Sequence, residues 1–170
     1  NFVLVAMSFL FYAWGEPVWV FLLLASGFLV WLCSLLVERF AGTWKGKAAL
    51  VLAVTISLSL LGIFKYSGFL VENLNAILPV SLPVPKFSLP IGISFYTFQM
   101  ISYIVDVHRG EVKAQSSFLR FMMYVSMYFQ LVAGPIVRYS DVAREIDHRT
   151  ANVNDISHGI TRFCIGLLKK

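Results

Sequence analysis

The chain has 170 residues, of which 58% are hydrophobic and only 14% are charged. Together with a mean hydropathy of +0.76, this composition excludes an ordinary soluble domain, which needs a charged outer surface. The net charge of +5 does not indicate nucleic-acid binding, because the basic residues are scattered at helix ends and do not line one face together with aromatic residues. The composition predicts an integral membrane protein without a nucleic-acid partner.

Apolar runs at 2–15 and 17–37 predict two closely spaced helices, separated by a turn at 15–17 that contains Glu16. The second run has the length of roughly 17–25 residues that a spanning helix needs, and the first is short. Arg39, Lys45 and Lys47 then share one short loop. Since positive residues favour the cytoplasmic side, we expect this loop inside and the turn at 15–17 outside.

A third helix is predicted over about 48–64, with Lys65 and Tyr66 as its interfacial anchor. Thr55, Ser59 and Gly62 share one face of it, and small residues of this kind favour close packing against another helix. Residues 68–78 predict a separate, short interfacial helix. The proline-rich stretch 79–85 is incompatible with a helix and predicts a loop on the outer side.

Residues 90–105 predict the next helix, with Pro90 in its first turn, running inward to Asp106. Five residues fall within about 80° of one another on this helix: Gly92, Tyr96, Gln99, Tyr103 and Asp106. A polar face is costly against lipid, so this face should look into protein or a wet cavity. Two interpretations remain open, namely packing contacts with an Asp106–Arg109 pair or the wall of a substrate path.

The apolar run 116–132 creates a conflict in topology. If it crossed the membrane, the segment carrying Arg138, Arg144 and Arg149 would lie outside, against the charge rule. A re-entrant segment resolves the conflict, because irregular backbone at membrane depth is permitted where it lines protein or water. Met123, Ser126, Met127 and Gln130 form one face of this run, which either packs in the core or lines a tunnel with the first polar face.

Beyond the break at Gly134-Pro135, Arg138 is either a headgroup anchor or, with Arg144, a receptor for a phosphorylated or carboxylated ligand. A short amphipathic helix is predicted over 139–147. Helix-capping residues at 152–155 then predict a final helix that runs past Lys170.

The remaining candidate groups do not form a reactive set. Cys33 and Cys164 have no CxxC spacing and are interpreted as buried packing residues. His108, His148 and His158 lie in charged, water-accessible settings without metal-ligand spacing, so we predict no metal site.

Two long motifs resemble signatures of the membrane-bound O-acyltransferase family, closest to its alginate O-acetyltransferase branch. One is LPIGISFYTFQ at 89–99, followed by YIVD at 103–106 and RG at 109–110, and the other is QLVAGPIVRYSD at 130–141. FYAW at 11–14 and FKY at 64–66 match weaker signatures. The resemblance implies an all-α, polytopic membrane protein with helices around a central tunnel. Residues 1–170 would be a single membrane domain, the N-terminal portion of a longer protein.

The resemblance also implies a function in the bacterial cytoplasmic (inner) membrane as a multi-pass protein. It implies O-acetyl transfer from a cytoplasmic donor, acetyl-CoA or another acyl thioester, towards an exported polysaccharide such as alginate, often with a periplasmic acetyltransferase partner. No bound cofactor is expected, and membrane lipids surround the protein. The family's catalytic histidine belongs to a later membrane segment and is expected beyond Lys170. The chain alone is therefore expected to be inactive.

The residues expected to line the substrate tunnel are Tyr96, Gln99, Tyr103, Asp106, Met127, Gln130 and Arg138. A transporter or channel is the alternative, since it also needs polar stripes and broken helices, but it predicts related halves and the chain shows no repeat. A noncatalytic scaffold subunit of a polysaccharide export complex is the third possibility.

Overall fold

The computed structural model describes residues 1–77, 83, 89–127, 136–147 and 152–169. All regular structure in these residues is helical, which confirms the predicted all-α class. The helices are α1 (Phe2–Gly15), α2 (Trp19–Arg39), α3 (Trp44–Ile77), α4 (Ile93–Arg109), α5 (Phe118–Ser126), α7 (Tyr139–Asp147) and α8 (Val153–Leu168).

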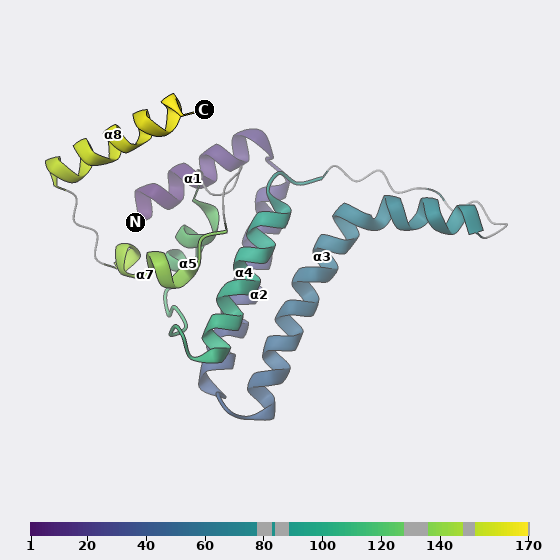
Figure 1. The fold of residues 1–170 in the computed structure, drawn as a ribbon. Helices are drawn as coiled ribbons and strands as arrows, with labels where there is room; N and C mark the ends of the chain where they lie inside the picture. Colours follow the sequence, from purple (N-terminus) through teal and green to yellow (C-terminus); the bar gives the residue numbers. More distant parts are fainter. Residues whose placement is uncertain (78–82, 84–88, 128–135, 148–151, 170) are drawn as a thin grey trace.

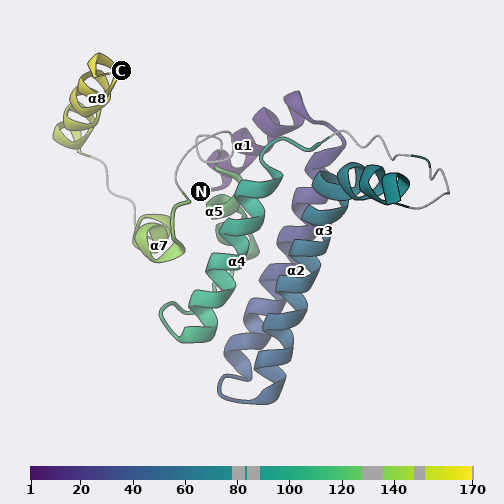
Figure 2. The same cartoon turned by 45° about the vertical axis from the view of Figure 1, so that its right-hand side comes forward.

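Helices α2, α4 and the first part of α3 pack against one another and form the central bundle (Figures 1 and 2). The α2–α3 connection and the end of α4 lie at one end of the bundle, while the start of α4 and the turn between α1 and α2 lie at the other (Figure 1). Helices α2 and α3 are long and apolar enough to cross a membrane. The arrangement fits part of a polytopic membrane fold.

Helix α1 has the predicted bounds, but it crosses the end of the bundle obliquely and does not pair lengthwise with α2 (Figures 1 and 2). Its contacts with α5 are more extensive than those with α2. The Tyr12 hydroxyl donates a hydrogen bond to the carbonyl oxygen of Ile91, at 3.0 Å. Helix α1 is therefore tied to the turn that precedes α4.

Helix α3 differs from the prediction in two ways. It continues without a break from Trp44 to Ile77 and does not end near residue 64, so the segment from residue 68 is its continuation and not a separate helix. The buried face of α3 also differs from the predicted one. Thr55 and Ser59 are exposed. The side facing the bundle carries Gly46, Ala49, Ala53, Ser57 and Leu61. The first four have small side chains, or none, and allow close approach.

Left-handed glycines mark both ends of α4. Gly92, with φ 74°, precedes the first helical residue, and Gly110, with φ 77°, follows the last one. Pro90 lies before the helix, where its carbonyl accepts a hydrogen bond from the Ile93 amide at 3.2 Å. The prediction that Pro90 occupies the first helical turn is therefore wrong, because Gly92 makes a turn that an L-residue rarely adopts.

Helix α5 has 9 residues, and at 1.5 Å per residue its length of about 14 Å is less than half of a bilayer core. It does not cross a membrane by itself. Residues 128–135 lie outside the described part of the chain, so the re-entrant path of 116–132 stays a prediction.

The two last helices lie where the capping and amphipathic patterns predict them. Helix α7 spans Tyr139–Asp147, and α8 begins after Asn152, whose side chain forms a capping box with Asp155. Helix α8 has no buried residue. Its Cys164 is exposed, so the expectation of a buried packing cysteine holds for Cys33 and is wrong for Cys164.

Candidate tunnel wall

The polar face of α4 points into the protein, as its cost against lipid requires. Tyr96, Gln99, Tyr103 and Asp106 are all buried, with at most 5% of their surfaces exposed. Phe95 and Phe98 on the other side of the helix are 37% and 46% exposed. These polar side chains of α4 thus face the protein interior while Phe95 and Phe98 face outward, which explains how so polar a helix fits in an apolar protein.

Gln99 connects α4 to α5. Its Nε2 donates a hydrogen bond to the carbonyl oxygen of Tyr124 at 3.0 Å. The Tyr124 hydroxyl in turn donates to the carbonyl oxygen of Val137, at 2.9 Å. Helix α5 is thus held between the polar face of α4 and the segment that leads into α7.

The second predicted face is partly assembled on α5. Met123 and Ser126 are buried, and Met127, just past the helix, is half-buried. The Ser126 hydroxyl donates to the carbonyl oxygen of Met122 at 2.7 Å, so it is satisfied within its own helix. Gln130, the last candidate of this face, lies outside the described residues.

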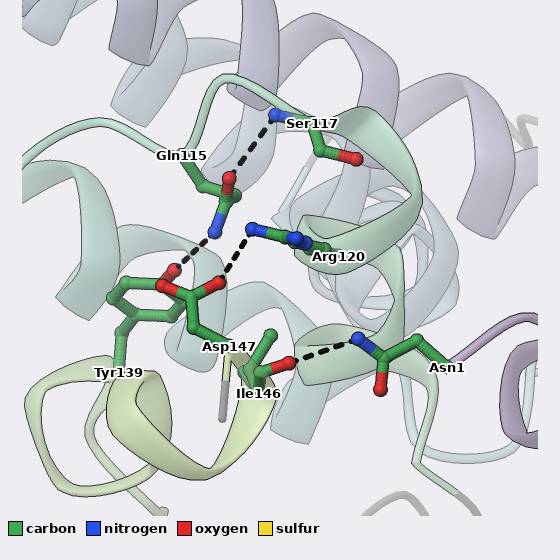
Figure 3. A network of polar contacts seen from close by, with 7 residues as sticks. All are labelled: Asn1, Gln115, Ser117, Arg120, Tyr139, Ile146 and Asp147. Carbon is green, nitrogen blue, oxygen red and sulfur yellow. Dashed lines mark hydrogen bonds and ion pairs between the residues drawn. The ribbon is translucent and has the colours of Figure 1, made fainter. Parts of the chain in front are cut away.

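Gln115 joins four parts of the chain, although no motif or periodicity in the sequence selects it. Its backbone amide donates to the Tyr103 hydroxyl at 2.8 Å, and its carbonyl oxygen accepts from Trp31 Nε1 at 2.7 Å. Its side chain donates from Nε2 to the Tyr139 hydroxyl at 2.9 Å and accepts from the Ser117 amide at 3.1 Å. Figure 3 shows the side-chain amide between Tyr139 and Ser117.

The tyrosines around this residue form an aromatic cluster. The ring of Tyr139 lies 5.0 Å from that of Tyr103 and 5.1 Å from that of Tyr124, both edge to face. Burial raises the pKa of the Tyr139 phenol, and the hydrogen bond from Gln115 opposes the rise. Tyr139 is therefore a neutral hydrogen-bonding group throughout the physiological pH range.

Two further contacts fasten α7 to the rest of the protein (Figure 3). Arg120 Nη1 lies 2.7 Å from Asp147 Oδ1, a salt bridge between α5 and α7. The side chain of Asn1 donates to the carbonyl oxygen of Ile146 at 2.9 Å. An open hollow of about 360 Å³ lies beside this network and is lined in part by Lys113, Gln115 and Tyr139.

Buried polar atoms without a partner occur at both ends of the α4 face. Among the described residues, the Tyr96 hydroxyl, Asp106 Oδ2 and the Ser8 hydroxyl have no hydrogen-bond partner. Such atoms are rare in folded proteins and usually mean water or a ligand, because an unpaired buried polar group costs several kilocalories per mole. These atoms could therefore still form hydrogen bonds with water or a ligand.

Two arginines near the end of α4 share one acidic partner. Glu111 lies between two of them, with 3.8 Å from Oε1 to Arg109 Nη1 and 3.8 Å from Oε2 to Arg138 Nη1. Arg109 thus has Glu111 as its ion-pair partner, and the expected pair with Asp106 does not form. All three side chains are largely exposed, so the pairs contribute little to stability.

No group of three or more histidine, cysteine or acidic side chains that could hold a metal ion occurs in the described ranges. His108 is half-buried and His158 is exposed, while His148 lies outside those ranges. The described residues therefore offer hydrogen-bonding and positioning groups, and no assembled set of nucleophile and base.

The relatives of this chain carry the names of O-acetyl transfer enzymes. The chain is 39% identical over its whole length to the probable alginate O-acetylase AlgI of Pseudomonas aeruginosa and 38% identical to that of Azotobacter vinelandii. It is 29% identical over 98% of its length to the peptidoglycan O-acetyltransferase of Helicobacter pylori. It spans only 34%, 35% and 37% of these proteins, in the same order.

No family profile and no solved structure matches the chain. Its similarity to the alginate O-acetylases nevertheless extends over every residue of the chain, including both long motifs. The chain therefore belongs to the membrane-bound O-acyltransferase family, with the alginate O-acetylases among its relatives.

Proposed function

We propose that the protein containing this chain is a membrane O-acetyltransferase that modifies an exported polysaccharide. The observation that carries the proposal is the similarity, over all of this chain, to proteins named alginate O-acetylases, at 38–39% identity. The more distant relative is named for peptidoglycan. The names share the transferred group and differ in the polymer, so alginate or a similar polysaccharide is the favoured acceptor.

The proposed reaction takes the acetyl group from a thioester, with acetyl-CoA as the expected donor on the cytoplasmic side. An acceptor hydroxyl attacks the thioester carbonyl, a C–O bond forms, the C–S bond breaks, and the hydroxyl proton leaves with the thiol. A histidine outside this chain, expected beyond Lys170, serves as general base. Residues 1–170 then form one membrane domain without the catalytic base, inactive alone.

The role we propose for this chain is to supply part of a tunnel wall. Tyr96 and Asp106 are the best supported wall residues, because each is buried on the inward face of α4 and has an unpaired polar atom. Gln99 and Tyr103 hold the neighbouring segments in place through their hydrogen bonds. Arg138, with Arg109 across Glu111, is an exposed positive site at the Asp106 end, suited to an anionic donor.

The proposed location of the protein is the bacterial inner membrane. The protein would be a multi-pass component of the bacterial inner membrane, working with a periplasmic acetyltransferase that receives the exported acetyl group. Met127 and Gln130 would extend the wall beyond α5.

Substitution of Gln99 tests the wall. Gln99→Leu removes the hydrogen bond from Nε2 to the Tyr124 carbonyl oxygen, which costs about 1–3 kcal/mol. In the full-length protein we expect reduced acetyl transfer at normal membrane expression. Phe98→Leu is the matched control, since Phe98 is the neighbour of Gln99 in the chain and lies on the exposed side of the same helix. Unchanged product acetylation in Gln99→Leu would remove Gln99 from the site.

The reaction itself is tested with full-length protein in vesicles supplied with radiolabelled acetyl-CoA. Label in ester linkage to added polysaccharide is the expected result. Free label that crosses the membrane without becoming attached would instead identify a transporter, and no movement of label in either form would leave the scaffold role as the explanation.

A further inference from the structure

Helix α3 is too long to cross a membrane in a straight line. Its 34 residues correspond to about 51 Å, whereas the hydrocarbon core is about 30 Å thick. The stretch from Trp44 to Lys65 already covers about 33 Å. The residues beyond it, which we call the α3 arm (residues 66–77), begin where the helix reaches the far surface of the membrane.

The α3 arm turns away from the bundle. In Figures 1 and 2, the last part of α3 leaves the direction shared with α2 and α4 and projects sideways. Ser67 and Gly68 lie at the start of the arm, and Gly/Ser pairs are a recognised cause of helix kinks. An axis that turns sideways at the membrane surface brings the arm into the plane of that surface.

The α3 arm is amphipathic around this axis. Apart from the half-buried Val71, its large apolar side chains fall within an arc of about 140° at 100° per residue, and all of these are exposed. They are Tyr66, Phe69, Leu70, Leu74 and Ile77. Asn73 also lies in this arc, but its Nδ2 donates to the carbonyl oxygen of Phe69 at 2.7 Å. Glu72, the only charged residue of the arm, lies on the opposite side.

The apolar arc continues the lipid-facing surface of the spanning part. Ile63 is 50% exposed on the outward side of α3, and Tyr66 and Leu70 follow it on the same stripe. When a helix bends away from its bundle, its outward side becomes the side that looks back toward the bilayer. The bend therefore turns the same stripe down onto the hydrocarbon boundary.

Lys65 anchors the bend at this boundary. Its Nζ lies 3.3 Å from the Ser94 hydroxyl oxygen, near the start of α4, and 5.5 Å from the centre of the Tyr66 ring. A lysine next to a tyrosine is the usual pair at the headgroup level, since each presents an apolar body and a polar tip.

We propose that the α3 arm lies in the membrane interface, with Phe69, Leu70 and Leu74 in the lipid boundary and Glu72 in water. Its partner is thus the bilayer surface, on the side of the membrane where α4 begins. The arm fixes the depth of α3 and α4, because sliding of α3 along the membrane normal would pull this apolar arc out of the lipid.

Site-directed spin labelling of the full-length protein in vesicles tests the proposal. Cys33 and Cys164 are first replaced by serine, and Leu70→Cys and Glu72→Cys are then labelled separately with a nitroxide. We expect the Leu70→Cys label to collide several-fold more often with dissolved oxygen than with a water-soluble nickel chelate, and the Glu72→Cys label to show the reverse preference.

Two outcomes would overturn the proposal. Equal access of the nickel chelate to both labels would mean that the arm projects into water. Shielding of both labels from both probes would mean that another protein surface covers the arm. Neither outcome bears on the acetyltransferase proposal, which depends on the transfer of labelled acetyl groups.

Discussion

Gln115 connects several elements through its hydrogen bonds, so its substitution should be especially disruptive. All four of its hydrogen-bonding groups are used, and their partners come from α2, α4, the start of α5 and α7. It is also buried, with 8% of its surface exposed. A buried amide that is hydrogen-bonded through both side-chain atoms rigidifies the elements around it.

We expect Gln115→Ala to loosen α7. The backbone bonds to Trp31 and Tyr103 remain, but the Tyr139 hydroxyl and the Ser117 amide each lose a partner. The loss is about 1–3 kcal/mol. Faster amide hydrogen exchange in 139–147 and a lower thermal midpoint in detergent are the expected readings. Ser116→Ala is the control, because Ser116 is exposed; equal exchange in the two variants would contradict this role for Gln115.

The polar face of α4 could be predicted from the sequence, but the central position of Gln115 could not, for a physical reason. Tyr96, Gln99 and Asp106 recur with the helical period in an otherwise apolar run, so their common direction can be calculated. Gln115 lies in a short connection between charged residues, where no periodicity applies. Only the tertiary positions of Trp31 and Tyr139 make it central.

At the level of helices, α2 and α5 approach one another closely at Gly27. A Cβ atom added to Gly27 would lie 2.6 Å from the sulfur of Met122. Because the obstacle is the end of a flexible side chain, a small residue would be tolerated more easily than a branched one. The contact helps to place α5, which also packs against α1 and α4.

Gly27→Val should therefore destabilise the α2–α5 contact, by about 1–3 kcal/mol for an overpacked core site. Gly62→Val on α3 is the matched control, since no described atom lies within 4 Å of the position of its added Cβ. Thermal unfolding of both variants in detergent measures the difference. Equal midpoints would show that Met122 moves aside at no cost.

The boundaries of the helices were predictable where local chemistry sets them. Asn152 and Asp155 form the capping box that their spacing suggests, and α7 has its expected length. The continuation of α3 through residues 65–68 was not predictable, because Lys65 marks a membrane boundary and not a helix end. The choice between its two small-residue stripes likewise depended on the positions of α2 and α4.

For the whole molecule, the arrangement of ends supports the orientation drawn from the charges. The α2–α3 connection, with Lys45 in the first turn of α3, lies at the end of the bundle where α4 finishes with Arg109, and the α1–α2 turn with Glu16 lies at the opposite end (Figure 1). The charge rule assigns the first end to the cytoplasm.

Cysteine accessibility tests this orientation in intact cells that express the full-length protein without its native cysteines. We expect Glu16→Cys to react with a membrane-impermeant maleimide and Lys45→Cys to react only after the membrane is permeabilised. The reverse pattern would invert the orientation and place the Asp106 end of α4 outside.

The two left-handed glycines that delimit α4 have a consequence for transfer across the membrane. Gly92 and Gly110, both in the left-handed conformation, end this helix at 17 residues, about 25 Å. This length is less than the thickness of a bilayer core, about 30 Å. In the tunnel that we propose, an acyl group moving along the polar face of α4 would therefore travel a path shorter than the surrounding lipid is thick.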